Sequence, residues 1–122
     1  MAKALGVGGL FIRSKDPRGL AKWYETHLGI NLAPTDMEMS PWQTDAGVTV
    51  FAPFAEDTDY FRSDKSFMIN FRVDDIKALV GELRDKGIEV TNEQSMDGLG
   101  HFAHTEDPEG NPIELWEPTE SS

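Results

Sequence analysis

The chain has 122 residues, no cysteine, and 22 acidic against 11 basic residues, which gives a formal net charge of −11 at pH 7. This length predicts one domain, and the lack of cysteine excludes disulfides, thiolate metal ligands and cysteine nucleophiles. The acidic balance argues against nucleic-acid binding. The chain has no run of about 18 apolar residues, so we expect no membrane-spanning helix. We therefore expect a cytoplasmic protein.

The first half of the chain begins with an apolar stretch at residues 10–13, which predicts a strand. A helix is expected over residues 17–28, because Asp16 is a good N-cap, Pro17 suits the first helical position and Gly29 is a good stop. Three further strands are expected, at residues 30–32, 42–44 and 48–53.

The second half repeats this plan, with Arg72 in the place of Arg13. It predicts a strand from residue 69, a helix over about 75–86, and strands at 88–90, 101–106 and 112–118, with residues 93–100 as a glycine-containing flexible loop. Asp107-Pro108-Glu109-Gly110 predicts a tight turn between the last two strands. Each half therefore has the order βαβββ. We expect a single domain of two modules, at about 6–54 and 67–118, with a connector at 55–66 and a frayed tail at 119–122.

Two βαβββ modules, the strand-Arg-x-x-Asp openings and the closing Asp-Pro-x-Gly-Asn-x-Ile-Glu-Leu motif from Asp107 resemble the vicinal oxygen chelate superfamily. That superfamily includes glyoxalase I, bleomycin-resistance proteins and extradiol dioxygenases, and the chain is most similar to the bleomycin-resistance-like branch. The resemblance implies an α+β fold: an open cup of mostly antiparallel eight-stranded sheet with the helices outside. It also implies a homodimer, since a second copy usually covers the open sheet edges. A ferredoxin-like sandwich is the alternative.

Enzymes of the superfamily hold a divalent metal through ligands at fixed strand positions. The resemblance places these positions at Gly9, near Thr49, at Met68 and at Glu114. Gly9 has no side chain and the Met68 thioether suits soft metals, so Glu114 is the one strong ligand for a hard or borderline cation. We therefore expect no cofactor, unless His104 or His27 joins Glu114 in a rearranged metal site.

Strand alternation predicts which side chains line the cup. The expected ligand-binding residues are Phe11, Arg13, Trp42, Met68, Asn70, Arg72 and Trp116. Each arginine can instead pair with a neighbouring aspartate, and each tryptophan can instead belong to the core. The resemblance also implies that His104, three residues before the turn, points into the cup near Glu114, so we expect the two to approach each other and to form an acid–base pair.

Two main functions follow from these residues. The first is metal-free binding of a small molecule in an aromatic cup, where the acidic surface suits a cationic aromatic ligand. The alternative is a glyoxalase-type lyase or isomerase that uses Glu114 with a metal, or Glu114 with His104 as acid and base. A third interpretation is an interaction or regulatory module. Whether the protein is an enzyme stays open.

Overall fold

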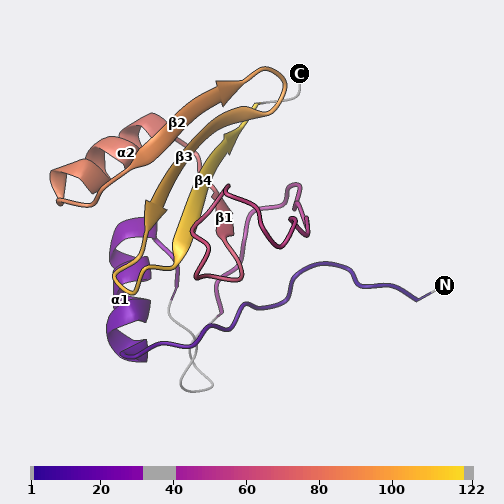
Figure 1. Ribbon diagram of the computed structural model, residues 1–122, viewed down its shortest axis with the longest axis horizontal. Coiled ribbons are helices and arrows are strands. Elements are labelled where there is room, and N and C mark those ends of the chain that lie inside the picture. Colours follow the sequence, from indigo (N-terminus) through magenta and orange to yellow (C-terminus); the bar gives the residue numbers. More distant parts are fainter. Residues whose placement is uncertain (1, 32–40, 120–122) are drawn as a thin grey trace. The chain divides into compact units, whose positions relative to one another are not determined.

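A computed structural model describes residues 2–31 and 41–119. The chain divides into two compact units, with the boundary between residues 56 and 57. The fold is α+β, with two helices and one four-stranded sheet among the described residues (Figure 1). The end of the strand expected at 30–32 and most of the expected frayed tail lie outside the described residues.

The sheet belongs entirely to the second unit and has the order β1-β4-β3-β2. Its strands are β1 (Ile69–Arg72), β2 (Thr91–Met96), β3 (Gly100–Glu106) and β4 (Pro112–Pro118). β1 runs parallel to β4, whereas β4 with β3 and β3 with β2 are antiparallel. The strands predicted from residue 69 and at 101–106 and 112–118 are therefore present.

Helix α2 (Ile76–Asp85) packs against β3 and β4 on one face of this sheet (Figure 1). Asp75 is its N-cap, since the carboxylate accepts a hydrogen bond from the backbone N–H of Ala78 at 3.0 Å. The core lies between the helix and the sheet, where Leu83, Ile113 and Leu115 are almost completely buried. No helix in residues 2–31 or 41–119 is long and apolar enough to cross a membrane.

The prediction for residues 88–100 is wrong in its boundaries. The strand expected at 88–90 begins instead at Thr91, and most of the expected flexible loop at 93–100 is part of β2. A short turn through Gly98 (φ 80°) and Gly100 (φ 126°) joins β2 to β3. Antiparallel pairing with β3 overrides the low strand propensity of Asn92 and its polar neighbours, because the partner strand supplies the hydrogen bonds.

The first unit contains helix α1 (Pro17–Leu28), which has the predicted bounds. The Asp16 carboxylate accepts a hydrogen bond from the Gly19 N–H at 3.1 Å, and Gly29 ends the helix with φ 71°. The strands expected at 10–13, 42–44 and 48–53 do not form in the described part of this unit. An apolar alternation yields a strand only where a partner backbone completes the ladder, so residues 2–31 and 41–119 form four strands where eight strands were expected in the chain.

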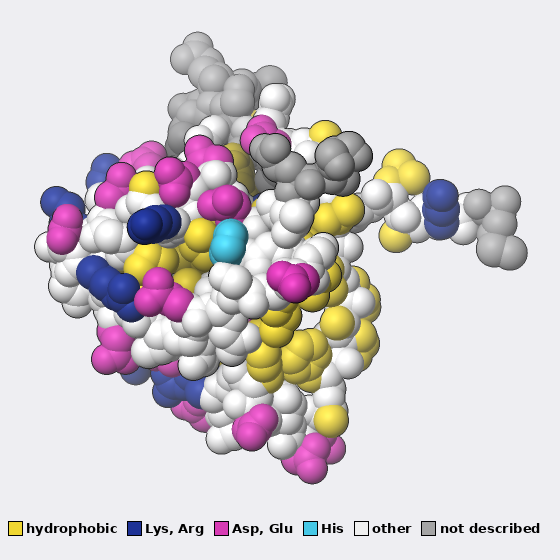
Figure 2. Space-filling model, turned by 90° about the horizontal axis from the view of Figure 1, so that it is seen from above, with side chains coloured by type: hydrophobic (Ala, Val, Ile, Leu, Met, Phe, Trp, Pro, Cys, Tyr) yellow, Lys and Arg dark blue, Asp and Glu magenta, His cyan; other side chains and the backbone are white. Residues whose placement is uncertain are grey.

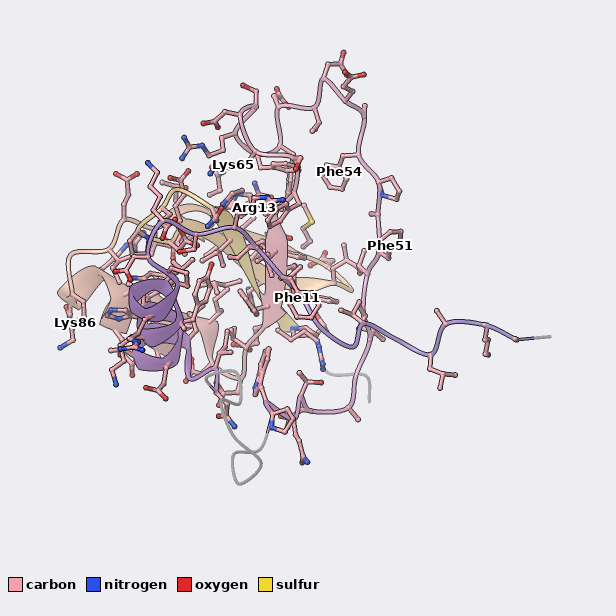
Figure 3. The ribbon with its side chains drawn as sticks, turned by 90° about the horizontal axis from the view of Figure 1, so that it is seen from below. Phe11, Arg13, Phe51, Phe54, Lys65 and Lys86 are labelled. Atoms are coloured by element: carbon pink, nitrogen blue, oxygen red, sulfur yellow. The ribbon has the colours of Figure 1, made fainter. Side chains whose placement is uncertain are left out.

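Large apolar side chains of the first unit are exposed. They are Leu5, Val7, Leu10, Phe11, Trp42, Val48, Val50, Phe51 and Phe54. Hydrophobic side chains reach the surface in Figure 2, and Figure 3 shows Phe11, Phe51 and Phe54 on stretches with neither helix nor strand. Among the described residues of this unit, Leu20 alone is a buried hydrophobic residue, so this unit has little core of its own.

Candidate functional site

The candidate site lies on the face of the sheet opposite α2. Along β4, Ile113 and Leu115 point into the core, so Glu114 and Trp116 point the other way. The register places Asn70 of β1 and His104 of β3 on either side of Glu114. Side chains from three strands therefore converge on one carboxylate.

Glu114 accepts hydrogen bonds from three different side chains. Asn70 Nδ2 donates to Oε1 at 2.8 Å, and His104 Nε2 donates to Oε2 at 2.8 Å. The hydroxyl of Tyr60 also donates to Oε2. The Glu114 side chain is only 9% exposed, and these donors compensate the cost of burying its charge.

The same contacts set the ionisation of the site. Burial by itself raises the pKa of Glu114, but the hydrogen bonds from His104, Tyr60 and Asn70 together outweigh it and lower that pKa. The pKa of Tyr60 is raised to about 12 by burial, then by its hydrogen bond to Glu114 and by the charge of that carboxylate. At neutral pH Glu114 is therefore an anion and Tyr60 a neutral donor.

His104 is held on both ring nitrogens. Nε2 faces Glu114, and Nδ1 lies 3.1 Å from the amide nitrogen of Asn92 on β2. The Tyr60 ring meets the imidazole edge to face, with the ring centroids 5.2 Å apart and the planes at 82°. The imidazole is therefore fixed in position as well as in direction.

Tyr60 belongs to residues 57–68, which have neither helix nor strand. Arg62 fastens this segment: its guanidinium contacts Asp64 at 2.6 Å, Glu106 at 3.1 Å and the carbonyl of Gly110 at 3.1 Å. The turn that carries Gly110 is ordered by Asp107, whose carboxylate accepts hydrogen bonds from the backbone N–H groups of Glu109 and Asn111. The tight turn between β3 and β4 thus helps to hold Tyr60 above the sheet.

A cavity of about 680 Å³ adjoins this cluster within the second unit. Its lining includes the aromatic and apolar residues Tyr60, Phe61, Met68 and Ile113 and the polar residues Asn92 and His104. The charged residues of its lining are Asp57, Asp59, Arg62, Glu89 and Glu106. This volume lies within the usual range for small-molecule sites, roughly 300–1,000 Å³.

The predicted site residues fall into two groups. Asn70, Glu114 and His104 are in direct contact, Met68 lines the cavity, and Arg72 stands opposite Trp116 in the register of β1 and β4. Phe11, Arg13 and Trp42 belong to the first unit, whereas Glu114 and His104 belong to the second. Ligand contacts of all these residues stay predictions.

Trp116 is packed more deeply than a residue at the mouth of a cup. It is 8% exposed, and its indole N–H donates to the carbonyl of Leu99 at 2.8 Å. Its ring stacks on Phe102 with centroids 5.9 Å apart and planes 3° from parallel. Trp116 is therefore buried against Phe102 and Leu99 on the sheet face that carries Glu114, and its contact with a ligand stays a prediction.

Tyr60 and Asn92 were not predicted from the sequence. Tyr60 is 54 residues from Glu114 in a segment without a periodic pattern, so no spacing relates the two. Asn92 has the positive φ of 53° and lies where the β2–β3 register shifts, so strand alternation does not indicate its direction. The acidic and aromatic composition of residues 54–65 was the one available signal for Tyr60.

The side chains at Glu114 do not fit a divalent metal ion. Both carboxylate oxygens already accept hydrogen bonds, and His104 Nε2 is aimed at Glu114 rather than at a shared point beside it. In the described ranges 2–31 and 41–119, no group of three or more His, Asp or Glu residues is arranged to hold a metal ion. A metal at Glu114 would have to replace at least one of three donors. The absence of a cofactor stays a prediction.

The chain belongs to the glyoxalase-like domain family, which matches residues 9–116, and hence to the vicinal oxygen chelate superfamily. One similar solved structure is TnmS3, an antibiotic-binding protein from Streptomyces sp. CB03234. It has 24% identity over 97% of this chain and 100% of its own, with a TM-score of 0.61. Another is a glyoxylase/bleomycin resistance protein/dioxygenase domain from Frankia sp. EAN1pec, with 18% identity, coverage of 96% and 100%, and a TM-score of 0.56. At identities of 24% and 18%, these two structures show that the chain shares their fold and do not show a shared function. Among curated proteins, none matches the chain.

Proposed function

We propose that the protein binds a small amphipathic molecule, without metal, in the cavity beside Glu114 and His104. The observation that carries this proposal is the cavity itself, about 680 Å³ in volume, whose lining includes aromatic, thioether and hydrogen-bonding residues. The antibiotic-binding relative has the same fold, which makes such a role compatible with the architecture.

The charges around the cavity favour a cationic ligand. Four carboxylates line it, those of Asp57, Asp59, Glu89 and Glu106, against the single guanidinium of Arg62. Arg62 is already paired with Asp64 and Glu106, so its charge is largely compensated. A planar aromatic cation would meet the faces of Tyr60 and Phe61 in a negative field.

Binding is tested by titrating the protein with proflavine, a planar aromatic cation, and with 8-anilinonaphthalene-1-sulfonate, an anion of similar size. We expect saturable binding of proflavine that weakens several-fold in an Asp59→Asn/Glu89→Gln double variant. Asp97→Asn is the matched control, because it removes a carboxylate from the β2–β3 turn, outside the cavity lining. Preference for the anion, or equal weakening by the control, would contradict the proposal.

An acid–base activity is the second candidate function. It is favoured by the 2.8 Å contact between His104 and Glu114, which leaves an oriented imidazole on the cavity wall. Such a pair suits proton transfer in a glyoxalase-type lyase or isomerase reaction. Turnover of the methylglyoxal–glutathione hemithioacetal, measured with and without added Ni²⁺ or Zn²⁺ and abolished in His104→Ala, would support it; no turnover under any of these conditions would leave the binding role.

Assembly into a homodimer and formation of the eight-stranded cup are further parts of the proposal. The exposed apolar side chains of the first unit, such as Phe11 and Phe51, need a covering surface, and residues 10–13 and 48–53 have strand-like alternation. A second copy supplies both. Light scattering after size exclusion should then give about twice 13.6 kDa, and amide exchange should show protection at 10–13 and 48–53. A monomer without such protection would contradict this. A cytoplasmic location remains an expectation.

A further inference from the structure

Glu114 lies one hydrogen bond behind the wall of the cavity. It is not among the residues that line the cavity, but two of its donors, Tyr60 and His104, are. Both donate to the same oxygen, Oε2, whereas the other oxygen, Oε1, accepts a hydrogen bond from Asn70 of β1. A molecule in the cavity would therefore reach Oε2 if one of these two lining side chains moved aside.

The two lining donors are held to different degrees. His104 belongs to β3, which is paired on both sides within the sheet, and its side chain is 13% exposed. Tyr60 lies in a segment with neither helix nor strand and is 38% exposed. The ion pairs by which Arg62 fastens this segment are partly exposed to water, and such pairs contribute little stability. Tyr60 is therefore the donor that can leave Glu114 at the smaller cost.

The donors around Glu114 do not include a fixed positive charge. The Tyr60 hydroxyl and the Asn70 amide are neutral, and none of the three donors is a lysine or an arginine. The Glu114 side chain is only 9% exposed, so water contributes little to stabilising its charge. A carboxylate in such surroundings gains more from a cation that donates a hydrogen bond than from a neutral hydroxyl. A positively charged donor can therefore replace the Tyr60 hydroxyl favourably.

We propose that Tyr60 occupies the place of a ligand's ammonium group. An aromatic molecule that carries a protonated primary or secondary amine displaces the Tyr60 hydroxyl and donates a hydrogen bond to Oε2 of Glu114. This inference rests on the proposed binding function and deepens it, because it selects among cationic aromatic ligands those whose cation bears N–H groups. A quaternary ammonium ion has the same charge but no hydrogen to donate, so it would leave Tyr60 in place.

The variant Tyr60→Phe removes the hydroxyl and retains the ring. The ring continues to line the cavity and to meet the imidazole of His104 edge to face. Oε2 of Glu114 then has one donor fewer, and the ammonium group of a ligand reaches it without competing against a hydroxyl. Affinity for a protonated primary amine should rise about tenfold, the effect of one hydrogen bond to a charged group. Affinity for a quaternary ammonium ion should change little.

The test uses two probes that share one ring and one charge, 1-naphthylmethylammonium and its N,N,N-trimethyl derivative. Each is titrated into the full chain at pH 7 and followed by calorimetry. We expect the wild type to bind the primary amine several-fold more tightly, and Tyr60→Phe to increase this preference by about tenfold. Tyr24→Phe is the matched control, because Tyr24 is the other tyrosine of the chain and lies on α1, outside the cavity lining. It should leave both affinities unchanged.

Displacement of Tyr60 has a separate NMR readout. Nuclear Overhauser contacts between the rings of Tyr60 and His104 should disappear when the primary amine saturates the wild type, and should persist with the trimethyl derivative. Contacts that persist with both probes, or a preference that Tyr60→Phe does not increase, would overturn the inference and leave the binding of aromatic cations standing. Failure of the primary amine to bind would also overturn it, and the binding proposal falls as well only if proflavine does not bind.

Discussion

Substitution of Glu114 by glutamine tests the hydrogen-bonded cluster most severely. The change preserves the size of the side chain but replaces the charged oxygen Oε2 by an oxygen or an NH₂ group of a neutral amide. With the amide oxygen toward Asn70, the NH₂ group faces the Nε2–H of His104, which is a donor, and the Tyr60 hydroxyl, which would have to turn and accept. Glu114→Gln therefore opposes donor to donor inside a buried site.

The cost is estimated from the bonds that are lost. One charge-assisted hydrogen bond is worth about 1.5–3 kcal/mol, and the remaining ones weaken when the charge disappears. The site is well shielded, with the side chains of His104 and Glu114 13% and 9% exposed, so little of this loss is recovered by water. We expect the free energy of unfolding to fall by about 2–3 kcal/mol at pH 7. With a urea m-value of about 1.5 kcal/mol/M, the midpoint falls by about 1.5 M.

The pH dependence provides a second measurement. Because the folded pKa of Glu114 lies below its ordinary value of 4.5, the carboxylate contributes stability above that pH. The contribution is lost as pH falls through the lower, folded pKa, when the native state must take up the proton. Glu114→Gln should lack this component of acid destabilisation.

Urea unfolding, followed by circular dichroism from pH 3 to pH 8, checks both expectations. Glu93→Gln is the control, because it removes a β2 carboxylate whose ion pair with Arg84 is half exposed and lies outside the cluster, and it should barely move the midpoint. A Glu114→Gln midpoint within about 0.3 M of wild type, or equal shifts in both variants, would refute the reasoning about the cluster.

Three further substitutions test other parts of the account. In a Tyr24→Phe background, ultraviolet titration should give Tyr60 a pKa of about 12, and Glu114→Gln should move this pKa toward the ordinary value of 10.0. An ordinary Tyr60 pKa in the presence of Glu114 would contradict the Tyr60–Glu114 contact. Gly110→Ala should cost about 1–2 kcal/mol in urea unfolding, because φ is 82° and a Cβ would crowd Arg62, and unchanged stability would argue against that turn. Leu83→Ala should cost about 2–5 kcal/mol by the same assay, since Leu83 is 1% exposed against the sheet; a loss below 1 kcal/mol would not fit this core.

The sequence predicted those features that local chemistry determines. The N-cap Asp16 and the stop at Gly29 placed the first helix closely, because these signals act within one turn of the chain. Alternation along the last strand predicted that Glu114 would leave the core face, and the resemblance to the superfamily placed His104 near it, as the register confirms. The contact between the two was therefore expected from strand alternation together with the resemblance, and an acid–base role stays a prediction.

The features that the sequence did not predict depend on contacts between segments that are distant along the chain. The strand at 91–96 exists because β3 pairs with it, and the expected strands of the first unit lack a partner backbone in the structure. Tyr60 reaches Glu114 through a segment that Arg62 fastens to Glu106 and Gly110, and no periodic pattern encodes such a bridge. Asn92 depends on a register shift, which reverses the alternation that sequence patterns assume.

The most direct test of the central claim is a titration of ¹⁵N-labelled protein with proflavine, followed by backbone amide NMR. If the cavity beside Glu114 and His104 is a binding site for amphipathic cations, saturable shifts should concentrate at residues 57–63, 91–92 and 104–106, which line it. Shifts confined to other regions, such as α1, or no saturable shifts at millimolar proflavine, would contradict the claim that this cavity is the binding site.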